Sequence, residues 1–196
     1  HKSYEPLKLF MNNKIVVFIS GSGSNAKNII NYFSDNSDFQ VSHVFSNNKH
    51  SDFGNYIKNT TVQYFLFEEA EIYGKVFKEL KKINPKLIIL AGFLKKIPPL
   101  YINFFKNKII NIHPSLLPKY GGEGMYGLNI HKKVIENEEV ETGISIHYVT
   151  EEYDSGKIIF QKKIKVAKYD TPEKLEEKIH KLEYEYFPKV IESLLI

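Results

Sequence analysis

The feature that most constrains the fold is a regular alternation of short apolar, β-branched runs with longer segments of helical spacing. Residues 14–20 (KIVVFIS) and 87–91 (LIILA) are apolar almost throughout, which is typical of strands buried on both faces. Further strands are expected at 40–46, 62–67 and 108–112. Because helical segments separate these strands, the pattern predicts an α/β fold with a doubly wound, mostly parallel sheet covered by helices on both faces.

The remainder of the chain predicts how this sheet is flanked and closed. Apolar residues at regular helical spacing predict one continuous helix over 68–83. Residues 142–150 and 157–167 alternate like strands and are expected to be antiparallel. Pro172 then opens a long helix over 173–195, which we expect to close the domain.

Length and composition limit the class of protein. We expect a single Rossmann-like domain over 14–196, preceded by an extension over 1–13 that is either native or left from cloning. The absence of cysteine excludes disulfides, thiolate zinc sites and cysteine nucleophiles. No apolar run reaches about 18 residues and no signal-peptide pattern is present, so we expect a cytoplasmic domain without membrane contact. The net charge of +4 comes from lysines interspersed with acidic residues, so no nucleic-acid partner is expected.

A short loop of glycine and serine, Gly21-Ser22-Gly23-Ser24-Asn25, follows the first predicted strand directly and precedes a helical pattern. Glycines let the backbone approach a ligand closely, and the helix that follows presents free N–H groups to an anion. The loop therefore fits a phosphate site, although an ordinary strand-to-helix turn capped by Ser24 or Asn25 fits it too. It is neither a P-loop nor a complete dinucleotide-binding motif.

Asn111 and His113 form a sharper signal at the end of the strand expected over 108–112. Strand alternation places both side chains on one face, at the carboxyl end where open α/β sheets bind their ligands. An amide donor beside an imidazole suits a reaction in which negative charge develops on a carbonyl oxygen. A structural histidine at a strand end is the alternative for His113.

The segment 111–120, NIHPSLLPKY, resembles the signature of the folate-dependent formyltransferases. The resemblance extends over 14–195 and includes, besides the glycine–serine loop, Leu90-Ala-Gly-Phe93, Thr142-Gly143, His147-Tyr-Val149 and Asp154-Ser-Gly156. It implies transfer of the formyl group of the co-substrate 10-formyltetrahydrofolate to the amine of glycinamide ribonucleotide, a step of de novo purine biosynthesis.

The resemblance also implies three catalytic residues, namely Asn111, His113 and Asp154. Asn111 and a protonated His113 would stabilise the tetrahedral oxyanion that forms when the amine attacks the formyl carbon. Asp154 is expected to raise the pKa of His113 by favouring the charged form of the ring. Without the resemblance, Asp154 would be interpreted as a turn residue in an Asp-Ser-Gly sequence.

Two binding regions and no metal site follow from the same resemblance. The phosphate and ribose of the ribonucleotide are assigned to Gly21, Ser22, Gly23, Ser24, Asn25 and Glu183, although Glu183 could instead be a solvated helix carboxylate. The folate is assigned to Leu94, Lys95, Lys96, Ile97, Asn111, Glu151, Glu152, Tyr153 and Asp154. His147 is expected to be structural, and Glu69 falls near a position where many family members carry an arginine.

Three alternative functions remain open. A formyltetrahydrofolate deformylase and a sugar-nucleotide formyltransferase would share the catalytic signature. The first is expected to carry an additional N-terminal domain, and the second to lack the short glycine–serine loop. A non-catalytic nucleotide-binding module would use that loop but would leave Asn111, His113 and Asp154 unexplained. The sequence is compatible with a monomer or a homodimer.

Overall fold

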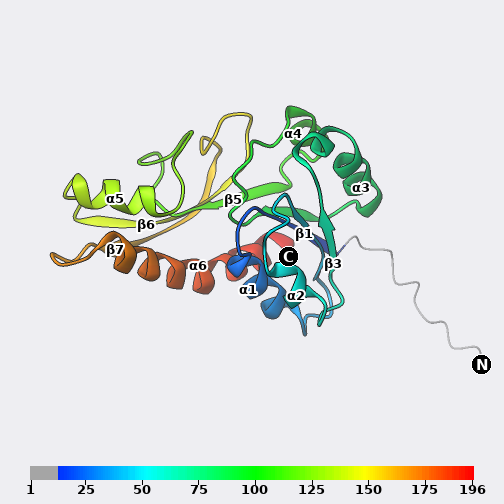
Figure 1. Cartoon of the computed structure of the whole chain (residues 1–196), viewed down its shortest axis with the longest axis horizontal. Helices are drawn as coiled ribbons and strands as arrows, with labels where there is room; N and C mark the ends of the chain where they lie inside the picture. The colour runs from blue at the N-terminus through cyan, green and yellow to red at the C-terminus, as the bar shows by residue number, and fades with distance from the viewer. Residues whose placement is uncertain (1–12) are drawn as a thin grey trace, which may run out of the picture.

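The computed structural model describes residues 13–196, which form seven strands and a set of flanking helices (Figure 1). The strands are β1 (Lys14–Ile19), β2 (Gln40–Ser46), β3 (Gln63–Leu66), β4 (Leu87–Leu90), β5 (Ile109–His113), β6 (Glu141–Tyr148) and β7 (Ile158–Lys165). The helices are α1 (Ser24–Phe33), α2 (Phe53–Ile57), the 3₁₀-helix η1 (Glu69–Tyr73), α3 (Lys75–Ile83), α4 (Pro99–Phe104), α5 (Leu128–Glu136) and α6 (Pro172–Leu195).

One mixed sheet runs through the molecule in the strand order β3-β2-β1-β4-β5-β6-β7. Neighbouring strands from β3 to β5 are parallel, whereas β6 pairs antiparallel with β5, and β7 pairs antiparallel with β6. The predicted fold, with a mostly parallel sheet, antiparallel C-terminal strands and a closing helix, is therefore confirmed.

Successive side chains of the central strand β1 enter two separate hydrophobic cores. Ile15, Val17 and Ile19 pack on the face covered by α1, α2 and α6, whereas Val16 and Phe18 pack on the face covered by α3 and α4. All five side chains are fully buried. Figure 1 shows the two groups of helices on opposite sides of the sheet. Burial on both faces explains why this strand contains no polar alternation.

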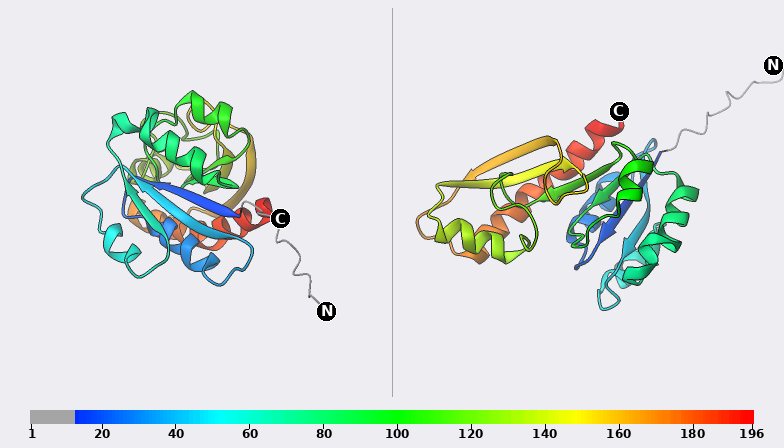
Figure 2. Two further views of the ribbon diagram at one scale, coloured as in Figure 1. Left: turned by 90° about the vertical axis from the view of Figure 1, so that its right-hand side faces the viewer. Right: turned by 90° about the horizontal axis from the view of Figure 1, so that it is seen from above.

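The C-terminal helix α6 connects the two ends of the molecule. It contacts α5 and β6 at one end and α1 farther along, as Figure 2 shows. Ile130 and Val134 of α5 and Leu175 of α6 form a third, smaller core there. A residue on α6 can therefore lie beside the loop after β1, although more than 150 residues separate them in the chain.

The strand order creates a topological switch point between β1 and β4. The chain proceeds from β1 outward to β2 and β3, and then returns to β4 on the other side of β1. The loops that leave β1 and β4 meet at the carboxyl edge, where the Ser20 N–H donates to the Gly92 carbonyl at 3.1 Å. Open α/β sheets bind ligands in the crevice at such a point.

The helix predicted over 68–83 is divided in two, which corrects the expectation of one continuous helix. Glu68 and Glu71 form a reciprocal capping box that starts η1, and Gly74 separates η1 from α3 with φ −125° and ψ −84°. Glycine costs about 1 kcal/mol in a helix interior relative to alanine, so the break occurs at this residue.

Two further expectations concern the ends and the surroundings of the chain. The extension predicted over 1–13 lies outside the described residues, except for Asn13. Over residues 13–196, none of the helices combines the length and the apolar character that crossing a membrane requires.

Candidate active site

A cavity of about 420 Å³ opens at the carboxyl ends of β4 and β5. Its walls come from residues 92–97 after β4, from the glycine-rich loop at 122–126, and from the segment 147–154 that ends β6 and follows it. Asn111 and His113, both at the end of β5, line it as the strand alternation predicts. The side chains at the carboxyl ends of these parallel strands thus line one crevice, as expected for an open α/β sheet.

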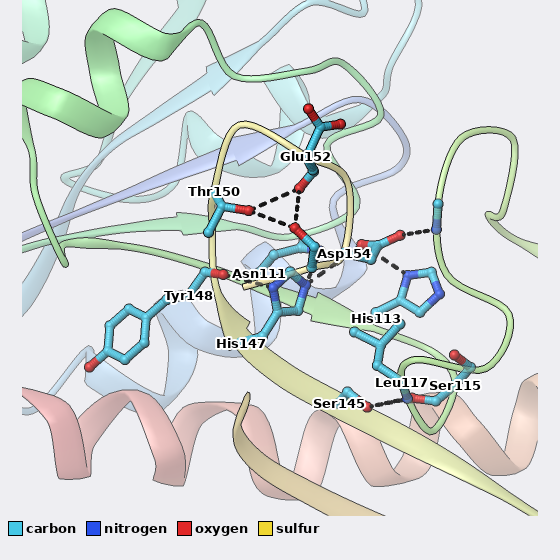
Figure 3. A network of polar contacts seen from close by, with 12 residues as sticks. Asn111, His113, Ser115, Leu117, Ser145, His147, Tyr148, Thr150, Glu152 and Asp154 are labelled. Carbon is cyan, nitrogen blue, oxygen red and sulfur yellow. Dashed lines mark hydrogen bonds and ion pairs between the residues drawn. The ribbon is translucent and has the colours of Figure 1, made fainter. Parts of the chain in front are cut away.

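The predicted catalytic residues Asn111, His113 and Asp154 lie together in this cavity, with His147 among them (Figure 3). The Asp154 Oδ1 atom lies 3.5 Å from His113 Nδ1 and 3.6 Å from His147 Nε2. The other carboxylate oxygen, Oδ2, accepts a hydrogen bond of 2.9 Å from the Gly122 N–H. The side chains of His113 and Asp154 are only 5% and 10% exposed, so solvent screens the carboxylate little from a proton on the ring.

His147 connects the catalytic amide to the catalytic carboxylate. Its Nδ1 lies 2.9 Å from the Tyr148 carbonyl oxygen, which can only accept, so Nδ1 carries the proton. In the neutral ring Nε2 then accepts from Asn111 Nδ2 at 3.2 Å, which fixes the orientation of the Asn111 amide. The expectation that His147 is structural does not include this contact, which depends on the antiparallel register that places His147 opposite Asn111 in β5 and β6.

Burial lowers the pKa of His113 below its usual value, and this effect outweighs the opposing influence of Asp154. Asp154, the hydrogen bond to the Tyr120 carbonyl and the charge of Glu183 all raise the pKa, while His147 lowers it. The pKa of His113 therefore disagrees with the expectation that Asp154 holds this ring protonated, although Asp154 does raise that pKa as expected. A neutral ring can instead accept a proton from an attacking amine.

Contacts with its neighbours hold Asp154 as a carboxylate. Burial raises its pKa, but the contacts with His147, His113 and the Gly122 N–H prevail and lower the pKa below its ordinary value. Its φ of 52° lies in the left-handed region, which aspartate adopts more readily than most residues other than glycine.

The predicted ribonucleotide residues come from two distant parts of the chain and meet beside the cavity. Asn25, at the start of α1, donates through Nδ2 to the Glu183 Oε2 at 2.9 Å, and Glu183 is buried on α6. His180 Nδ1 also lies 3.0 Å from that oxygen. The Ser20 hydroxyl accepts from the Leu94 N–H at 3.0 Å, so the glycine–serine loop adjoins the cavity wall.

The glycine–serine loop places Gly21 and Ser22 in solvent and buries Gly23. Gly23 has φ 72°, and a Cβ there would collide with the Phe53 ring. The Asn25 Oδ1 atom is buried and has no protein partner within the described chain. An unsatisfied buried acceptor next to free helix N–H groups is compatible with a ligand at this position.

The segments predicted to bind the folate line the cavity, with one exception. Leu94, Lys95, Lys96, Ile97, Glu152 and Tyr153 are all part of its wall. Glu151 is exposed and lies outside this wall, so its contact with a bound folate stays a prediction. At the exposed rim, Lys95 forms an ion pair of 2.9 Å with Glu69, and Lys96 lies 3.7 Å from Glu152.

A search of residues 13–196 gives no group of three or more histidine or acidic side chains that could hold a metal ion. The cluster around Asp154 supplies an amide, two imidazoles and a carboxylate, whose polar atoms lie 3.2–3.6 Å from one another. This set can donate to a developing oxyanion, accept a proton and stabilise the resulting positive charge.

The chain belongs to the formyl transferase family, whose model matches residues 13–191. It is 34% identical to phosphoribosylglycinamide formyltransferase, chloroplastic, of Arabidopsis thaliana, over 98% of this chain and 67% of that protein. It is 33% identical to phosphoribosylglycinamide formyltransferase of Escherichia coli, over 90% of this chain and 84% of that protein. The crystal structure of phosphoribosylglycinamide formyltransferase from Anaplasma phagocytophilum superposes with a TM-score of 0.84 at 31% identity, covering 93% of this chain and 86% of that one.

Proposed function

We propose that the protein transfers the formyl group of 10-formyltetrahydrofolate to the amine of 5-phosphoribosylglycinamide, giving formylglycinamide ribonucleotide and tetrahydrofolate. The observation that carries the proposal is the cluster of Asn111, His113 and Asp154 in a cavity next to the glycine–serine loop. The names of relatives that match along more than 90% of this chain support the same reaction.

The reaction needs one bond formed, one bond broken and one proton moved. The substrate amine attacks the formyl carbon, and the Asn111 amide donates a hydrogen bond to the oxyanion that forms. His113, neutral at the start, accepts a proton from the amine, and Asp154 stabilises the imidazolium that results. The C–N10 bond then breaks, and the same proton passes to the folate nitrogen, so His113 is regenerated.

The two substrates are assigned to different parts of the site. The folate occupies the cavity, with Leu94–Ile97 and Glu152–Asp154 around it. The phosphate of the ribonucleotide is assigned to Gly21–Asn25 and its ribose to Glu183, which the Asn25 side chain contacts, and its amine must reach His113 for the transfer. The assignment of the domain to 14–196, a cytoplasmic location and a monomeric or homodimeric state belong to the same proposal.

The direct test is an assay with both substrates and with each one omitted. Protein, 10-formyltetrahydrofolate and 5-phosphoribosylglycinamide should give tetrahydrofolate and the formylated ribonucleotide in equal amounts. Release of formate without the ribonucleotide would indicate a deformylase instead. Transfer to an amino sugar nucleotide, with none to the ribonucleotide, would indicate a sugar-nucleotide formyltransferase, and no turnover of the folate would favour a binding module.

A further inference from the structure

The backbone carbonyl of Tyr120 contacts the catalytic histidine directly. His113 Nε2 lies 2.7 Å from this oxygen. Because a carbonyl oxygen only accepts hydrogen bonds, Nε2 must carry a proton whether the ring is neutral or charged. The contact therefore selects one tautomer of the neutral ring, with its lone pair on Nδ1. That nitrogen faces Asp154 Oδ1 at 3.5 Å.

Tyr120 presents this carbonyl from a backbone conformation that its own side chain would not normally favour. Its φ is 56°, in the left-handed region where a bulky residue is a genuine outlier. Such a conformation costs on the order of 1–3 kcal/mol and persists only where surrounding contacts hold it. The contacts that hold Tyr120 are thus a condition for the His113 hydrogen bond.

The Tyr120 hydroxyl group provides such contacts. It donates to Glu139 Oε1 at 2.9 Å and accepts from Asn137 Nδ2 at 2.8 Å. Lys119 Nζ lies 2.9 Å from both oxygens of Glu139, which fixes the carboxylate that receives the hydroxyl. On the other side of the turn, the Ser115 hydroxyl donates to the Lys119 carbonyl at 2.6 Å. The backbone at Tyr120 is therefore held at its side chain and at the preceding turn.

The two residues after Tyr120 position the other member of the catalytic pair. The Gly122 N–H donates to Asp154 Oδ2 at 2.9 Å. A Cβ at Gly121 would lie 2.6 Å from Leu117 Cδ2 and 3.2 Å from the Asp154 Cβ, so a glycine at this position permits the close approach. The backbone of this turn thus holds both members of the pair, His113 through the Tyr120 carbonyl and Asp154 through the Gly122 N–H.

We propose that Tyr120 is a positioning residue of the transfer reaction. Its anchored side chain holds the carbonyl that keeps the proton on His113 Nε2, so the proton that moves during the reaction is exchanged at Nδ1, beside Asp154. The proposal rests on the proposed function for its chemistry, but the tautomer of His113 is a property of the protein alone and can be measured without substrates.

The test is Tyr120→Phe, which removes the hydroxyl and both of its hydrogen bonds while keeping the ring. The tautomer of His113 is read by ¹⁵N NMR of the imidazole nitrogens, and kcat and KM are measured across pH. Tyr56→Phe is the matched control, because its half-buried hydroxyl donates to Asn31 Oδ1 at 2.9 Å away from the cavity. Glu139→Gln is a milder second variant that keeps an acceptor but removes the charge opposite Lys119.

In the wild type the neutral ring should carry its proton on Nε2, and Tyr120→Phe should give a mixture of both tautomers. The kcat of this variant should fall about tenfold, as expected for a misplaced reacting group, with both KM values changed less than about twofold. The kcat of Glu139→Gln should lie between those of Tyr120→Phe and the wild type, and the kcat of Tyr56→Phe should equal that of the wild type. A His113 that keeps one tautomer and a normal pH profile in Tyr120→Phe would overturn the proposal. A wild type that shows the expected tautomer but transfers no formyl group would overturn the proposed function instead.

Discussion

Replacement of Asp154 by asparagine isolates the electrostatic part of the site. The substitution keeps the size of the side chain and an oxygen that can accept from the Gly122 N–H, but it deletes the negative charge 3.5 Å from His113 Nδ1. Burial favours the neutral form of His113, and Asp154 favours the charged form. The sign follows directly: without the carboxylate, the pKa of His113 falls farther below its ordinary value.

The magnitude follows from the distance and the burial of the pair. At 3.5 Å and an effective dielectric constant of about 20, opposite unit charges attract by about 5 kcal/mol. Shifts caused by one neighbouring charge usually amount to about 1–3 pKa units, or about 1.4–4 kcal/mol. Because His113 is neutral before the reaction, this energy is lost when the imidazolium forms. The kcat should therefore fall by about 10- to 1000-fold, and acidification should not restore it.

Two measurements on the same variant separate this explanation from misfolding. NMR titration of His113 gives its pKa in wild type and Asp154→Asn, and the pH–kcat profile gives the acid limb, which should move to lower pH. The matched control is Asp170→Asn, which removes a buried carboxylate that binds Lys178 at 2.7 Å in another part of the protein. This control should lose stability but keep the His113 pKa and the kcat.

The reasoning fails if the pKa of His113 in Asp154→Asn is unchanged or higher than in the wild type, even when activity is lost. It also fails if kcat recovers at low pH, because recovery would mean that a protonated His113 is the reactive form before the amine attacks. In that case, the original expectation of a histidine held protonated by Asp154 would be correct in the substrate complex.

Four further substitutions test other parts of the protein. His113→Ala should lower kcat by about 10²–10⁴-fold with little change in either KM, and retention of half the wild-type kcat would exclude a catalytic role. Gly23→Val should destabilise the fold by about 2–4 kcal/mol in urea denaturation, because the Gly23 backbone has φ 72° and the new side chain would collide with the Phe53 ring. Gly21→Ala, with no atom within 4 Å of the new Cβ, should keep the stability but raise the KM for the ribonucleotide severalfold. A KM equal to that of the wild type would remove the loop from the site. Burial lowers the pKa of His131 to about 4, so the folded state binds fewer protons than the unfolded state between pH 4 and 6.5, and stability rises with pH there. His131→Gln should reduce the difference in unfolding free energy between pH 4.5 and pH 7 by about 2–3 kcal/mol, and an unchanged difference would contradict a buried neutral His131.

The sheet could be predicted from the sequence because its strands are short, β-branched and buried on both faces. The runs at 15–19 and 87–91 each contain five consecutive apolar residues, whose side chains alternate between the two cores. The break at Gly74 could not be predicted in the same way, because the apolar spacing continues through η1 and α3. Hydrophobic periodicity reports which face is buried and is insensitive to a local change of helix type.

The parts of the candidate site that depend on side-chain chemistry could be predicted from the sequence. The parts that depend on strand register or on a backbone carbonyl could not. Asn111 and His113 follow from strand alternation, whereas Asp154 was identified only through the family resemblance. His147 meets Asn111 through the antiparallel pairing of β5 and β6, which the sequence of neither strand specifies alone. Tyr120 leaves no signal at all, because its contact with His113 is made by a carbonyl that every residue possesses.

Burial and Asp154 shift the pKa of His113 in opposite directions, which suits a ring that must take up a proton and then release it. Burial keeps the ring neutral before the amine attacks, so a lone pair is available to receive the proton. Once the ring is charged, one nitrogen faces the Tyr120 carbonyl and the other faces Asp154, so both N–H groups of the imidazolium have acceptors. A ring stabilised more strongly in its charged form would arrive already protonated and could not accept from the amine. A ring without Asp154 would accept the proton only at a much higher energy. The site therefore requires burial and the carboxylate together, because proton transfer is most efficient when the pKa of the group lies near the working pH.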